Sequence, residues 1–180
     1  MRQRNRTDRS LTGLSGWKKG LLALALVAVC LPGGVASAQV GMTLDEFENI
    51  SGKPIDTYKA EDGTKGLIYR DVWYSEKTGK QFAGRTAIEM GADQRVVKEV
   101  FFFDEPLPNT PEGAVDAVGI ALNLLPPKSP QKFVDSGRRT YEHGYVLWFD
   151  YGGGRYINFF LNQEETKIEA VVGGIEATNI

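Results

Sequence analysis

Two segments of the chain carry apolar residues at the spacing of an amphipathic helix. In the first, residues 44–50 follow Thr43, which forms a capping box with Glu46. Gly52 and Pro54 come after the segment and end it. The pattern predicts a helix of about two turns with one apolar face, and a helix this short needs a packing partner to be stable.

The second helical segment begins at Thr110, a capping residue, and has Pro111 at its first helical position. Pro126 and Pro127 end it, because proline cannot continue a helix. We expect its buried stripe to consist of the larger apolar side chains, Val115, Val118, Leu122 and Leu125.

Apolar and polar residues alternate in the other segments, as they do in half-buried strands. Strands are predicted over residues 55–59, 67–74, 82–90, 96–103, 138–142, 145–151, 156–161 and 167–172. Gly152 and Gly153 are predicted to form a tight hairpin turn, and Asp104–Asn109 a linker. The strands follow one another closely, which is typical of antiparallel meanders.

The order of helix, strands, helix, strands predicts an α+β fold built from tandem helix plus antiparallel β-meander repeats. We expect the helices to pack on one face of a curved antiparallel sheet. The first unit would cover residues 39–104 and the second residues 105–180, with a repeat of about 70 residues. The alternative is one continuous α+β domain whose strands merely recur.

The first 38 residues have the three parts of a secretory signal peptide. Residues 1–20 are basic, residues 21–31 are apolar, and Ala36-Ser37-Ala38 has the small-residue pattern that signal peptidase accepts. The apolar run is about half of the roughly 20 residues that a spanning helix needs, so we predict a signal peptide over residues 1–38. Val29 precedes Cys30, whereas a lipidated cysteine normally follows a small residue, so lipidation is not expected.

Removing this leader would change the charge of the chain. The whole sequence has 21 Lys and Arg against 23 Asp and Glu, whereas residues 39–180 have 15 against 22, a net charge of −7. Such an acidic domain has no electrostatic reason to bind nucleic acid or an anionic membrane. Cys30 is the single cysteine, so the exported part would be held by packing without a disulfide.

The segment from Gly41 to Pro54 resembles the opening of a known group of small exported proteins. Its Gly-Met-Thr-x-x-Glu-(apolar)-x-x-(apolar)-x-Gly-x-Pro pattern is similar to that of the SmpA/OmlA (BamE-like) family. The duplicated helix-and-sheet layout looks like the β-lactamase inhibitor protein (BLIP-like) family. This chain lacks the lipidated cysteine of the first family and the repeat cysteines of the second. The resemblance implies a non-enzymatic binding module.

The sequence offers little for catalysis or metal binding. His143 is the single histidine and follows Glu142 in a predicted turn, where a histidine is most often solvated. Gly152-Gly153-Gly154 is followed by a predicted strand, whereas a phosphate-binding loop leads into a helix. We therefore predict no catalytic residue, no metal site and no cofactor.

Aromatic residues are concentrated on the predicted strands, in numbers that two short helices cannot cover. Within residues 145–151, alternation places Trp148 on the face opposite Tyr151. Exposed Tyr and Trp beside Arg are typical of binding hot spots, although such aromatics can also pack on one another across strands. The predicted partner-binding residues are Trp73, Tyr74, Arg85, Trp148, Tyr151, Arg155 and Tyr156.

These observations favour an exported, non-catalytic protein-binding module that is periplasmic or extracellular. Its partner would be an unidentified envelope or secreted protein, recognised through an aromatic-rich sheet face, with no membrane association after signal cleavage. The alternative is a small-ligand carrier or enzyme with a pocket between the helices and the sheet.

Overall fold

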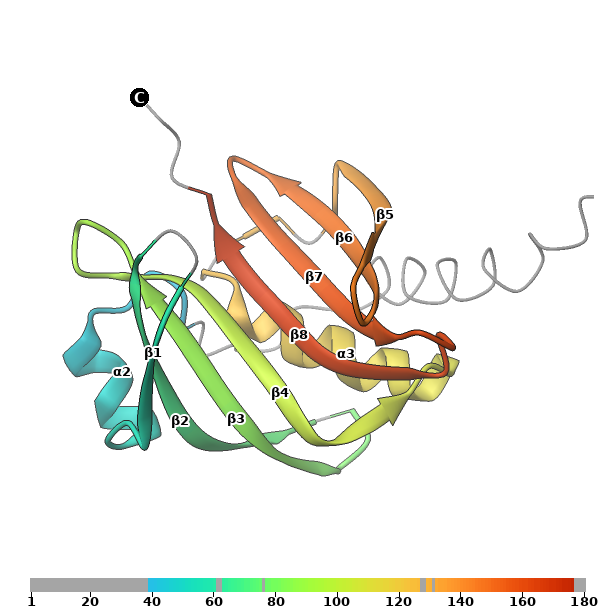
Figure 1. Cartoon of the computed structure of the whole chain (residues 1–180), viewed down its shortest axis with the longest axis horizontal. Coiled ribbons are helices and arrows are strands. Elements are labelled where there is room, and N and C mark those ends of the chain that lie inside the picture. The colour runs from blue at the N-terminus through green and yellow to red at the C-terminus, as the bar shows by residue number, and fades with distance from the viewer. Residues whose placement is uncertain (1–38, 61–62, 76, 127–128, 131, 177–180) are drawn as a thin grey trace, which may run out of the picture.

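Eight antiparallel strands form one open sheet in the computed structural model (Figure 1), which describes residues 39–176 apart from 61–62, 76, 127–128 and 131. The predicted signal peptide lies outside the described residues. The order of strands across the sheet is β1-β2-β3-β4-β8-β7-β6-β5. Their bounds are β1 Asp56–Lys59, β2 Lys65–Tyr74, β3 Gln81–Met90, β4 Val96–Pro108, β5 Asp135–Tyr141, β6 Gly144–Gly152, β7 Arg155–Asn162 and β8 Lys167–Ile175.

Two helices pack on the sheet, α2 (Leu44–Ser51) and α3 (Pro111–Leu124). The predicted capping box of α2 is confirmed, because Thr43 Oγ1 accepts from the amide of Glu46 while the Glu46 carboxylate accepts from the amide of Thr43. Thr110 caps α3, because its Oγ1 accepts from the amide of Gly113. Neither described helix is long and apolar enough to cross a membrane.

The sheet confirms the predicted α+β class, the antiparallel strands and their approximate positions, but the predicted linker Asp104–Asn109 is wrong. β4 continues through residues 104–108 as a strand. A bulge between Phe102 and Leu107 lets it pair again with β8, where Leu107 lies opposite Ile168. β4 therefore runs across the predicted boundary between residues 104 and 105, and a single sheet joins both halves of the described chain.

The predicted buried stripe of α3 is also partly wrong. Val118 and Leu125 are buried, but Val115 and Leu122 are only half-buried. The fully buried face is mostly small, with Ala114, Ala117 and Ala121 at 0% exposure. Small side chains let α3 lie close to the sheet, and a Cβ at Gly173 of β8 would be 2.5 Å from Leu124 Cβ.

The sheet has one helix-covered face and one outer face, which we define as the side opposite α2 and α3. Tyr69 of β2 marks the helix-covered face, because its ring packs on Phe47 of α2 with centroids 4.9 Å apart. Figure 1 shows α3 running behind β4 and β8, so the outer face is turned toward the viewer. Side chains alternate between the two faces along every strand.

Two hydrophobic clusters fill the helix-covered face. The α3 core, which includes Trp73 and Phe101, lies under α3, and the α2 core includes Phe47, Tyr69, Ile88 and Val96. On each of the strands β2, β3 and β4, a polar residue separates the two clusters along the strand. These residues are Asp71, Thr86 and Glu99.

Glu99 is the least solvated member of this polar line. Its side chain is 0% exposed, and neither carboxylate oxygen has a hydrogen-bond partner among the described residues. Thr86 Oγ1, on the neighbouring strand, donates instead to Asp71 Oδ2 at 3.0 Å. Burial raises the pKa of Glu99 well above its ordinary value of 4.5, and the Asp71 carboxylate raises that pKa further.

This environment predicts that stability falls as the pH rises. Above about pH 4.5 an unfolded chain releases the Glu99 proton while the folded chain keeps it, so the raised pKa favours the unfolded state. This costs about 1.4 kcal/mol of stability for each unit by which the folded-state pKa exceeds the unfolded-state pKa. We expect Glu99→Gln to be more stable than wild type at pH 7 and equally stable near pH 4. Urea unfolding followed by circular dichroism across this pH range measures the difference.

Glu105→Gln is the matched control, because Glu105 lies on the same strand but is exposed. Its free energy of unfolding should stay close to that of wild type, because substitutions of exposed side chains usually change stability little. A Glu99→Gln difference that is constant with pH would show that Glu99 is ionised in the folded protein.

Candidate functional site

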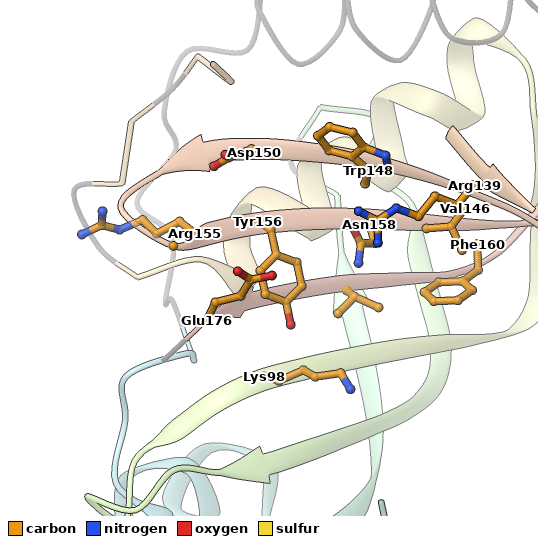
Figure 2. A pocket seen from close by; sticks show the side chains of 12 residues that line it. Lys98, Arg139, Val146, Trp148, Asp150, Arg155, Tyr156, Asn158, Phe160 and Glu176 are labelled. Carbon is orange, nitrogen blue, oxygen red and sulfur yellow. The ribbon is translucent and has the colours of Figure 1, made fainter. Parts of the chain in front are cut away.

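A hollow of about 450 Å³ lies on the outer face of the sheet, mainly over β6, β7 and β8 (Figure 2). Its apolar and aromatic lining comes from neighbouring strands, and polar side chains surround it. The lining residues on which the site depends are Lys98, Arg139, Trp148, Tyr156, Asn158 and Phe160.

The hollow exists because large side chains surround a strand of small ones. On the outer face, the regularly paired part of β8 presents Ala170, Val172 and Gly174. Its neighbour β7 presents Tyr156 and Phe160 at the positions directly opposite Gly174 and Ala170. The floor of the hollow is therefore β8, and the aromatic rings of β7 form one of its walls.

Glycines fix the positions of two of these rings. A Cβ at Gly174 would be 2.5 Å from the Tyr156 ring, and a Cβ at Gly137 would be 2.6 Å from the Trp148 ring. Each ring therefore lies directly over a glycine of the adjacent strand, an arrangement in which an aromatic residue covers the backbone that the glycine leaves exposed. The packing over these glycines holds both aromatic rings in place.

The ionisable groups around the hollow differ in their interaction partners. The Arg139 guanidinium lies 5.7 Å from the Trp148 ring centroid, within range of a cation–π interaction. Lys98 donates to Glu89 at 2.8 Å, and Tyr58 donates to the same carboxylate oxygen at 3.1 Å. Burial raises the pKa of Tyr156 to about 12, helped by the carboxylates of Glu89 and Glu176, so its hydroxyl is neutral at physiological pH.

Five of the seven predicted partner-binding residues remain accessible. Trp148, Arg155 and Tyr156 line the hollow, although Figure 2 shows the Arg155 guanidinium pointing away from its centre. Tyr74 and Arg85 lie on the outer face of β2 and β3, beyond the hollow, and Tyr74 is 55% exposed.

The structure places Trp73 and Tyr151 in the α3 core, at 7% and 2% exposure, so they cannot contact a partner. Strand alternation is the physical reason, because both residues share a face with the side chains under α3. The Trp73 ring packs edge-on against Phe101, with centroids 6.0 Å apart. Burial raises the pKa of Tyr151 to about 12.

Arg139, Asn158 and Phe160 are among the lining residues that the predicted surface did not include. Alternation along β7 from Tyr156 already puts Asn158 and Phe160 on the same face, so this signal was present in the sequence. Arg139 could not be placed in this way, because its position depends on the register between β5 and β6, where it lies opposite Val146.

The residues considered for chemistry lie apart from this hollow. His143 is in the turn between β5 and β6, where its side chain is 76% exposed and its Nε2 lies 3.9 Å from a Glu142 oxygen. Among the described residues, no group of three or more His, Cys, Asp or Glu side chains is placed to hold a metal ion. Within the part of the chain that the structure describes, the outer-face hollow is therefore our candidate site.

Comparisons with known proteins do not identify the chain. No protein-family model matches it. No curated protein matches it. It is structurally similar to an extracellular protein containing an SCP domain from Bacillus anthracis str. Ames, with a TM-score of 0.43 and 7% sequence identity. The match covers 81% of this chain and 48% of the other chain, and a likeness of this degree carries no argument about function.

The different environments of Tyr151 and Trp148 lead to a stability prediction. Tyr151→Ala should lower the free energy of unfolding by about 3–5 kcal/mol, because it empties a filled core position. Trp148→Ala removes a half-buried ring from the outer face and should cost about 1 kcal/mol or less, the scale of a cross-strand pair. Urea unfolding of both variants measures the contrast, and equal losses would contradict the assignment of the two faces.

Proposed function

We propose that this chain is an exported, non-catalytic binding module that recognises an envelope or secreted protein through the outer face of its sheet. The observation that carries this proposal is that the two faces of the sheet differ in what covers them. Both helices and both hydrophobic cores lie on one face, while the other carries a hollow walled by Trp148, Tyr156 and Phe160.

The composition of the outer face supports protein recognition. Phe102 is 42% exposed and Val72 is 57% exposed, so apolar surface extends from the hollow across β4 toward β2. Arg85 lies between them on β3, directly opposite Phe102. Aromatic and arginine side chains on an apolar surface are what the centres of protein interfaces contain.

We also propose that the fold is a tandem duplication. Each half consists of a capped helix followed by four strands, and each half contributes its last strand to the middle of the sheet. Because β4 and β8 pair in antiparallel fashion, the halves would be related by an approximate two-fold axis normal to the sheet. This supports the resemblance to BLIP-like proteins, and the segment 41–54 supports the resemblance to BamE-like proteins.

One observation favours the second candidate function, a small-ligand carrier with a site between the helices and the sheet. Glu99, the Tyr69 hydroxyl and the Trp73 indole nitrogen are all buried on the helix-covered face without a hydrogen-bond partner among the described residues. Polar groups of this kind are rare in a filled core and often mark functional positions. The two candidates therefore use opposite faces of the same strands.

Site-specific photo-cross-linking tests the proposed function and separates the two candidates. We expect a photoreactive residue at Phe102, on the outer face, to give a discrete adduct with a partner in an envelope extract of the source organism. The same residue at Ile50, which is 54% exposed on α2, should give none. Trp148→Ala should weaken the Phe102 adduct at least about tenfold, as expected when a hot-spot aromatic is removed.

Glu99→Gln is the control on the opposite face, and it should leave the adduct unchanged if the outer face binds the partner. Adducts of equal yield at Phe102 and Ile50 would count against the outer face as a recognition surface. Loss of the adduct in Glu99→Gln with normal folding would favour the carrier.

A further inference from the structure

The polar groups of the outer face fall into two sets. Arg70, outside the hollow, is paired with Asp104 through contacts of 3.2 and 2.7 Å, and Lys98, which lines the hollow, donates to Glu89. Inside the hollow, Arg139, the Trp148 indole and the Asn158 amide make no hydrogen bond or ion pair with any described residue. The hollow therefore presents donors whose partners the chain itself does not supply.

These donors lie close together. Trp148 and Asn158 are directly opposite one another on β6 and β7, and Arg139 lies over the Trp148 ring. Figure 2 shows all three side chains on the same side of the strands, beside Val146 and Phe160. A guanidinium, an indole N–H and an amide thus converge beside an apolar wall.

The two ends of the hollow differ in their charged groups, and the end beside Tyr156 has two acids together with Arg155, whose guanidinium points away from the centre. Arg139 lies at the end formed by Val146 and Phe160, whereas Asp150 and Glu176 lie at the other end, beside Tyr156. The acids would repel a second negative charge at their end and so direct an anionic group toward Arg139. A cationic group is disfavoured there, because Arg139 has no carboxylate partner that it could share.

We propose that the hollow binds an acidic side chain of a partner protein, with the carboxylate received by Arg139 and Asn158 and its apolar stem packed on Trp148 and Phe160. This inference rests on the proposed function and names the chemistry of the contact. A carboxylate suits these donors because charge-assisted hydrogen bonds from arginine are roughly twice as strong as neutral ones. A neutral amide or hydroxyl would leave the Arg139 charge without a counter-charge.

The test uses small probes, so it does not require the partner. Residues 39–180, which would remain after the predicted cleavage, are titrated with N-acetyl-aspartyl amide and, separately, with N-acetyl-asparaginyl amide. The side-chain N–H signals of Trp148 and Asn158 are followed by NMR. We expect saturable shifts at millimolar concentrations of the aspartyl probe, about threefold or more larger than with the asparaginyl probe.

Two arginine variants decide whether the response belongs to the hollow. Arg139→Gln should abolish the difference between the probes. Arg70→Gln should leave it unchanged, because Arg70 already has Asp104 as its partner. Equal shifts with both probes, or an unchanged preference in Arg139→Gln, would overturn the proposal. If the cross-link at Phe102 still forms in that case, the outer face recognises a partner by other chemistry and the proposed function stands.

Discussion

The pairing of β4 with β8 is the contact on which the rest of the structure depends. It joins two meanders into one sheet, with Phe102 opposite Ala170 and Lys98 opposite Gly174. The pairing of β4 with β8 positions features on both faces of the sheet. On one side α3 lies across it, close against Gly173, and on the other side β8 forms the floor of the hollow. A shift of one residue in this register would exchange the two faces of β8 and remove both features.

The division of the helix-covered face into two cores lowers the stability of the fold. Asp71, Thr86 and Glu99 interrupt the apolar surface between α2 and α3 on three successive strands, and the buried Glu99 carboxyl has no described partner. A buried polar group of this kind costs stability that an apolar side chain of similar size would not. The α2 core is consequently a small unit of its own, and α2 is tied to the sheet mainly through Phe47 and Tyr69.

Local signals in the sequence were sufficient for most elements of the fold, but not for the full length of β4. The capping box at Thr43 and Glu46 and the alternation in residues 145–151 depend only on neighbouring residues, and both are confirmed. The linker prediction failed because Asp104–Pro108 is polar and proline-rich, so its strand conformation depends on the distant residues Lys167 and Ile168. Contacts between strands that are far apart in the sequence cannot be read from local composition.

The residues of the candidate site could also be predicted only as far as local alternation along each strand allows. Alternation alone correctly separates Trp148 from Tyr151, but it cannot say which of the two faces the helices cover. Tyr151 and Trp73 were therefore grouped with Trp148, although they lie in the α3 core. The stripe of α3 was misjudged for a related reason, since the sequence draws attention to large side chains whereas close packing on β8 selects Ala114, Ala117 and Ala121.

Because β8 forms the floor of the hollow, the hollow can form only late in folding. The walls of the hollow come from β6 and β7, which are joined by a short hairpin. The floor is β8, the last strand of the described chain, and β8 must pair with β4, about seventy positions earlier in the sequence. A chain emerging from a ribosome therefore exposes the aromatic side chains of β6 and β7 before β8 has formed the floor of the hollow. The hollow is therefore complete only after β8 has paired with β4, so binding in it would depend on that long-range pairing.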